Sequence, residues 1–180
     1  KESEEAGDYA QAAQLYLQAG EHEDAAQRYV QCQYLTAVAE AEAGNMEKAG
    51  SLFLACGDYE DAAQKGRECI YQYACQQRDD GAYELAAAAF RRIPDYEDSQ
   101  AQITYCVYHQ ADSALAQGDF ASAVMLFTSV GDYEDAPQRI QESSYMLALD
   151  FIAKGDYHSA ETLLEGMEAT EENSGQLVSV

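Results

Sequence analysis

Apolar side chains recur along the chain at intervals typical of short amphipathic helices separated by turns. A large, mostly aromatic residue follows each turn, and these anchor positions are Tyr9, His22, Met46, Tyr59, Tyr83, Tyr96, Phe120, Tyr133 and Tyr157. The spacing between anchors alternates between 13 and 24 residues throughout. The sequence therefore contains a 37-residue repeat, made of one short and one long segment, which is a length typical of helix-turn-helix repeats.

A small residue stands three positions after every anchor. These residues are Ala12, Ala25, Ala49, Ala62, Ala86, Ser99, Ala123, Ala136 and Ala160. In the short segments, the seventh position after the anchor is large and apolar, and it is occupied by Tyr16, Phe53, Phe90, Phe127 and Leu164. Offsets of 0, 3 and 7 share one face of an α-helix. The pattern predicts short helices that approach a neighbouring helix closely at the small residue.

The long segments carry a second pattern, with tyrosine twelve and alanine fifteen positions after the anchor. The tyrosines are Tyr34, Tyr71, Tyr108 and Tyr145, and the alanines are Ala37, Ala74, Ala111 and Ala148. Aspartate occupies the second position after the anchor, at Asp24, Asp61, Asp98 and Asp135. We expect this aspartate to be the N-cap of the long helix, and we expect the glycine of the preceding Gly-Asp-Tyr-Glu turn to end the short helix in a left-handed conformation.

These patterns predict an all-α fold, a right-handed α-α superhelix of about four and a half helical hairpins. The predicted helices span residues 8–19, 24–43, 45–56, 61–79, 82–92, 98–117, 119–130, 135–154 and 156–168. Residues 1–169 are expected to form one repeat array, with residues 1–7 as the end of a preceding helix. Residues 170–180 are expected to be a tail or the truncated start of the next repeat.

The charge balance narrows the choice of partners. Asp and Glu number 33 against 10 Lys and Arg, so the net charge of −23 repels nucleic acids and anionic lipids and favours basic or neutral protein partners. No apolar run is long enough to cross a bilayer, and residues 1–5 lack the basic start of a signal peptide. We expect a cytoplasmic fragment of a longer protein, which would itself be one of its partners.

Neither the cysteines nor the acidic turns indicate a metal site. Three of the five cysteines, Cys32, Cys69 and Cys106, stand one repeat apart, which is typical of small packing residues in a reducing compartment. Acidic turns such as residues 58–61 offer carboxylates to calcium, but the spacing of a calcium-binding loop is missing, and helix capping explains the same acids. We expect no metal and no cofactor.

The run Gly118-Asp119-Phe120, followed by Ala123, Phe127 and Val130, resembles the second helix of the tetratricopeptide repeat. The chain differs from that family in its unit of 37 rather than about 34 residues and in lacking the closing proline. The repeated turn also resembles helical repeat regions of bacterial proteins and of eukaryotic trafficking solenoids. The resemblance implies an interaction scaffold, whose concave surface is lined by the first helix of each repeat, and it implies no substrate.

Two functions are compatible with these features, and neither is catalytic. The three histidines, His22, His109 and His158, bear no fixed relation to a nucleophile or an acid, and the glycines stand singly at helix ends. The chain is expected to be a scaffold that binds a peptide or protein segment along a concave, acidic groove. The alternative is a structural spacer or assembly arm of a larger protein, without a groove of its own.

Aligning the long helices with the groove-lining helix of tetratricopeptide repeats gives the candidate binding residues. They are Tyr34, Tyr71, Tyr108 and Tyr145, together with Tyr105, His109 and Arg78. Under the groove hypothesis, the tyrosine hydroxyl groups point into an acidic channel. The alternative is that such regularly spaced tyrosines belong to the core between helices.

Overall fold

The computed structural model describes residues 8–19 and 24–177, with side chains up to residue 167. The chain divides into two compact units, residues 1–100 and 101–180. The helix end predicted at residues 1–7 lies outside the described residues. The described residues are helices and turns without a strand, as the sequence predicts.

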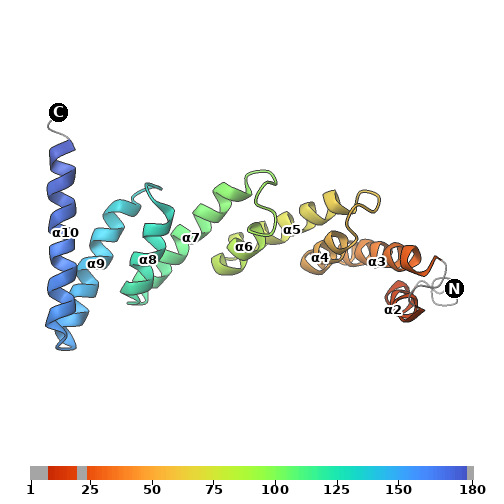
Figure 1. Ribbon diagram of the computed structural model, residues 1–180, viewed down its shortest axis with the longest axis horizontal. Helices are drawn as coiled ribbons and strands as arrows, with labels where there is room; N and C mark the ends of the chain where they lie inside the picture. The colour runs from red at the N-terminus through yellow and green to blue at the C-terminus, as the bar shows by residue number, and fades with distance from the viewer. Residues whose placement is uncertain (1–7, 20–23, 178–180) are drawn as a thin grey trace. The chain divides into compact units, whose positions relative to one another are not determined.

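Short and long helices alternate from α2 to α9 (Figure 1). The helices of the first unit are α2 (Tyr9–Ala19), α3 (Ala25–Glu42), α4 (Met46–Ala55), α5 (Ala62–Asp79) and α6 (Tyr83–Phe90). The second unit contains α7 (Ser99–Ala116), which begins just before the boundary, α8 (Phe120–Val130), α9 (Ala136–Ala153) and α10 (Tyr157–Leu177). Within each unit, helices that are adjacent in the sequence pack against each other. This arrangement agrees with a helical repeat.

The helix boundaries follow the repeat closely, except at the last helix. The helices from α2 to α9 lie within their predicted ranges, whereas α10 continues to Leu177 instead of ending at residue 168. Glu168 stands one repeat after Gly131, the residue that ends α8 with a φ of 63°. Because glutamate lacks the conformational freedom of glycine, the sequence supplies no stop at this point.

Two core clusters are each built from three successive helices, and another, with Ala12, Ala13 and Cys32, lies between α2 and α3. In the first unit, α3, α4 and α5 contribute Ala37, Ala49, Phe53, Cys56, Ala62 and Cys69. In the second unit, α7, α8 and α9 contribute Ala111, Ala123, Phe127 and Ala136. All nine small residues at the third position after the anchor are buried, as the sequence predicts. A larger side chain at these positions would separate the helices.

The turns before α5 and α9 contain two left-handed residues, of which the sequence predicts one, whereas the turn before α7 has Pro94 at the position of the glycine. Gly57 and Gly131 have φ values of 60° and 63°, as expected for residues that end a helix. The glutamate that precedes the N-cap is also left-handed, at Glu60, Glu97 and Glu134, with φ values of 48–49°. This conformation is uncommon for a residue with a side chain. Contacts of the neighbouring tyrosine and aspartate, described below, hold the turn in this shape.

We predict that Ala123→Leu destabilises the protein by about 1–3 kcal/mol, because the added atoms overpack a site that is fully buried between α7, α8 and α9. Ala88→Leu, at an exposed position of α6, is the matched control and should change stability much less. Chemical denaturation of both variants measures the difference. Equal losses would show that the packing face is assigned incorrectly.

Candidate functional site

Three tyrosines of the long helices each bind an aspartate that lies 27 residues further along the chain. The Tyr34 hydroxyl donates a hydrogen bond to Asp61 Oδ1 at 2.6 Å, and the Tyr71 hydroxyl donates to Asp98 Oδ1 at the same distance. The Tyr108 hydroxyl donates to Asp135 Oδ1 in the same way. Because the acceptor directly precedes the next long helix, each bond ties one long helix to the turn that starts the next.

The tyrosine rings are held between two other aromatic side chains of the repeat. The Tyr34 ring meets Phe53 and Tyr59 edge to face, with centroids 5.3 and 5.4 Å away. The Tyr71 ring meets Phe90 and Tyr96 in the same way, with both centroids 5.6 Å away. The Tyr108 ring meets Phe127 and Tyr133, with centroids 5.4 and 5.5 Å away. Aromatic pairs favour this edge-to-face geometry. Ring packing and hydrogen bonding therefore fix the same turn.

The structure corrects the role that the sequence assigns to these aspartates. Asp61 and Asp135 do stand at the N-cap positions of α5 and α9, but neither side chain makes a capping hydrogen bond. Their carboxylates accept the tyrosine hydroxyls instead. Side-chain capping occurs on short helices, where Asp119 accepts a hydrogen bond from the Ser122 backbone nitrogen at 3.2 Å. The constant separation of 27 residues between tyrosine and aspartate is the sequence signal for this bond.

These hydrogen bonds shift the pKa values of Asp61, Tyr71 and Tyr108. The hydrogen bond from Tyr34 lowers the pKa of Asp61, and the Lys65 ammonium lowers it further. The bond to Asp98 raises the pKa of Tyr71, and the bond to Asp135 raises the pKa of Tyr108 to about 12. The hydrogen bonds of Tyr71 and Tyr108 therefore stabilise the fold below the usual tyrosine pKa of about 10, and this effect is lost as the pH rises through the raised folded-state pKa. Asp61, whose pKa is lowered, stabilises the fold at neutral pH, and this stabilisation is lost as the pH falls below about 4.

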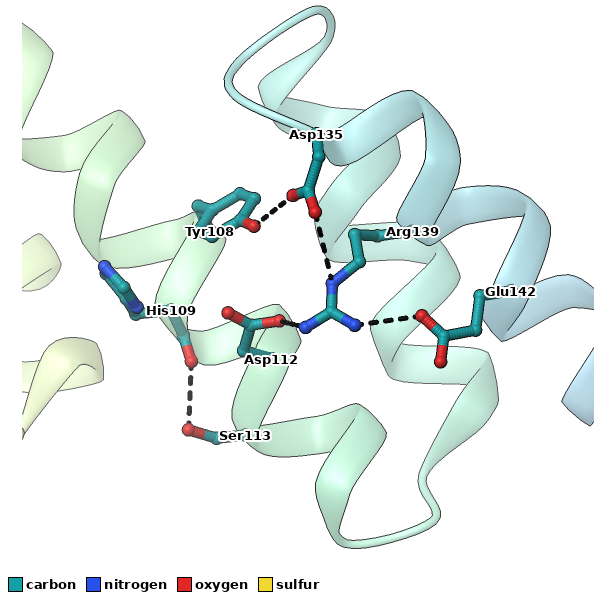
Figure 2. Close-up of polar contacts among 7 residues, drawn as sticks. All are labelled: Tyr108, His109, Asp112, Ser113, Asp135, Arg139 and Glu142. Carbon is teal, nitrogen blue, oxygen red and sulfur yellow. Dashed lines mark hydrogen bonds and ion pairs between the residues drawn. The ribbon is translucent and has the colours of Figure 1, made fainter.

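Arg139 of α9 connects three carboxylates beside the tyrosine of the second unit (Figure 2). Its Nη1 lies 2.9 Å from Glu142 and its Nε lies 4.0 Å from Asp135, while its Nη2 pairs with Asp112 of α7. The guanidinium carbon also lies 5.8 Å from the centre of the Phe127 ring. Hydrogen bonding to Glu142 and Asp112 raises the pKa of Arg139. The guanidinium is thus held over an aromatic ring by acidic side chains on two helices.

An acidic and aromatic cleft of about 510 Å³ opens beside Tyr108. Its lining residues are Tyr105, Tyr108, His109, Tyr133, Glu134 and Asp135. The ring centroid of His109 lies 4.3 Å from that of Tyr105 and 5.4 Å from that of Tyr108. The cleft therefore offers aromatic faces beside two carboxylates, a combination that suits a cationic ligand.

The structure brings together only part of the predicted site. Tyr105, Tyr108 and His109 share this cleft, while Arg78 lies at the end of α5 and forms an ion pair with Asp79 at 2.8 Å. Tyr145 is 53% exposed on α9.

The hydroxyl groups of the other three tyrosines, Tyr34, Tyr71 and Tyr108, each bind a carboxylate of the chain itself. They are bonded to aspartates because those carboxylates come within reach at the start of the next long helix. The three rings are half-buried among aromatic side chains, which agrees with the core alternative. Partner binding by the tyrosine row stays a prediction.

Comparisons with protein families, with curated proteins and with solved structures find no match for this chain. The described part of the chain contains no helix that is long and apolar enough to cross a membrane. Within the same residues, no group of three or more His, Cys, Asp or Glu side chains is arranged to hold a metal ion.

We predict that Tyr108→Phe lowers the free energy of unfolding by about 1 kcal/mol, because it removes the hydrogen bond to Asp135 and keeps the ring. Tyr145→Phe is the matched control, since Tyr145 occupies the same position of its repeat but its exposed hydroxyl binds no other described residue. Urea denaturation of both variants measures the difference. A loss at Tyr145 as large as that at Tyr108 would contradict this role of the hydroxyl.

Proposed function

We propose that the chain is a protein-protein interaction scaffold that binds an extended, basic or neutral segment of a partner. The cleft lined by Tyr105, Tyr108, His109, Tyr133, Glu134 and Asp135 is the observation that carries this proposal. The net charge of −23 supports the same class of partner, because it attracts basic segments and repels acidic ones.

The cleft has separate features for the apolar and charged parts of a basic side chain. The Tyr105 and Tyr133 rings offer aromatic faces to the stem of a lysine or arginine and to its cationic group. Asp135 is already bonded to Tyr108 and lies near Arg139, whereas Glu134 is exposed and makes no ion pair with any other described residue. Glu134 is therefore the carboxylate we assign to the partner's charge.

A structural spacer or assembly arm is the second candidate function. The observation that favours it is the internal use of the tyrosine row, since three of the four hydroxyl groups bind aspartates of the chain itself. A spacer would carry these bonds without a ligand in the cleft. The two candidates differ in whether isolated basic peptides bind the protein.

Titration calorimetry with an unstructured arginine-glycine peptide tests the scaffold. We expect saturable binding that weakens as salt is added, and we expect no binding of the matched glutamate-glycine peptide. Glu134→Gln should weaken binding about threefold, because one exposed charge pair is lost.

Glu60→Gln is the matched control for this experiment. Glu60 has the same left-handed conformation in the equivalent turn of the first unit, but Gln31 stands there in place of Tyr105. We expect its affinity to equal that of the wild type. Equal binding of both peptides, or the same weakening by both substitutions, would contradict the proposed site, and absence of any binding would favour the spacer.

A further inference from the structure

Equivalent positions of the two units, 74 residues or two repeats apart, carry different side chains beside the same phenylalanine. Phe53 of α4 corresponds to Phe127 of α8, and Glu68 of α5 corresponds to Glu142 of α9. At the two neighbouring positions, the first unit has Val38 and Lys65, whereas the second unit has Asp112 and Arg139. The chain thus contains two versions of the same site, one in each unit.

In the second unit this site is filled by the protein's own arginine (Figure 2). The Arg139 guanidinium lies over Phe127 and is bound by Glu142 on one side and Asp112 on the other. Planar guanidinium groups bind carboxylates and stack on aromatic rings more effectively than ammonium groups. The second unit therefore shows which chemical group fits this position of the repeat.

In the first unit the protein's own Lys65 lies over the phenylalanine, and an open cleft of about 240 Å³ remains beside it. Val38, Met46 and Phe53 form its apolar wall, and Glu42, Glu68 and Lys65 are among its polar lining residues. The Lys65 amine lies over the Tyr34 and Phe53 rings, 5.1 and 5.8 Å from their centres. It donates a hydrogen bond to the Tyr34 hydroxyl at 2.7 Å and lies 3.2 Å from Asp61. Its charge is thus balanced by a carboxylate outside the cleft.

The two glutamates of this cleft have no such balance. Among the described residues, neither Glu42 nor Glu68 forms an ion pair or a side-chain hydrogen bond, although the equivalent of Glu68 in the second unit binds Arg139. An apolar occupant would remove water from these carboxylates without replacing its hydrogen bonds, which is unfavourable. A cationic occupant with an apolar stem would satisfy both parts of the cleft.

We propose that the cleft between α3, α4 and α5 binds an arginine side chain of the partner. The stem of the arginine packs against Val38 and Met46, and its guanidinium group pairs with Glu68, as Arg139 pairs with Glu142 in the second unit. This assignment rests on the proposed function, and it deepens that function by naming the residue type that the first unit selects.

Methyl NMR with N-acetylarginine amide as the probe tests the assignment. We expect saturable shifts of the Met46 and Val38 methyl signals with this probe. N-acetylcitrulline amide has nearly the same shape without the charge, and it should produce no saturable shift. Equal shifts with both probes, or unperturbed Met46 and Val38 signals with the arginine probe, would overturn the proposal.

A variant that closes the cleft can be designed from the residues of the second unit. Combining Val38→Asp with Lys65→Arg transfers the arrangement of the second unit to the first, and these side chains already occur together in the same structural context at Asp112 and Arg139. We expect this variant to bind the arginine probe at the first-unit cleft about tenfold more weakly, because its own guanidinium occupies the site. Unchanged affinity in the folded variant would overturn the proposal.

A single substitution tests the same binding site if the double variant does not fold. Glu68→Gln changes one exposed residue, and it should also weaken binding of the arginine probe at Met46, whereas Glu84→Gln, on the exposed surface of α6, should not. The arginine-glycine peptide separates this proposal from the scaffold itself. Peptide binding that perturbs Tyr105 and Tyr133 but not Met46 would overturn the arginine site and leave the scaffold standing.

Discussion

The hydrogen bond from a tyrosine hydroxyl to the aspartate of the following turn is the contact on which the array depends. It joins side chains 27 residues apart and ties each long helix to the start of the next one. The turn that it holds contains a glutamate in a left-handed conformation, which the backbone alone disfavours. Without this bond and the aromatic rings around it, the conformation of the turn would be weakly specified.

Fixed and variable positions of the repeat have separate roles. The small residues, the phenylalanine and the tyrosine-aspartate pair recur in both units and hold neighbouring helices together. Positions beside them vary, as at Lys65 and Arg139, and the same scaffold then carries an open cleft in one unit and a closed ion-pair network in the other. A repeat protein can thus diversify its surface without changing its core.

The sequence predicts the helices well because its periodicity reports directly on burial. The spacing of anchors and small residues locates every helix from α2 to α9, and Ala123 and Phe127 are buried as expected. It predicts the site less well, because aspartate before a helix is typical of an N-cap and nothing local indicates that Asp135 accepts a distant hydroxyl. The open cleft beside Val38 depends on which way the Lys65 side chain turns, and a sequence pattern does not encode this choice.

A double-mutant cycle between Tyr71 and Asp98 tests the central claim most directly. Tyr71→Phe, Asp98→Ala and their combination are compared with the wild type by chemical denaturation, and the cycle isolates the interaction between the two side chains. Because the Tyr71 hydroxyl donates a hydrogen bond to Asp98, we expect a coupling free energy of about 1 kcal/mol between the two side chains. Additive effects of the two substitutions, with a coupling free energy near zero, would contradict the account.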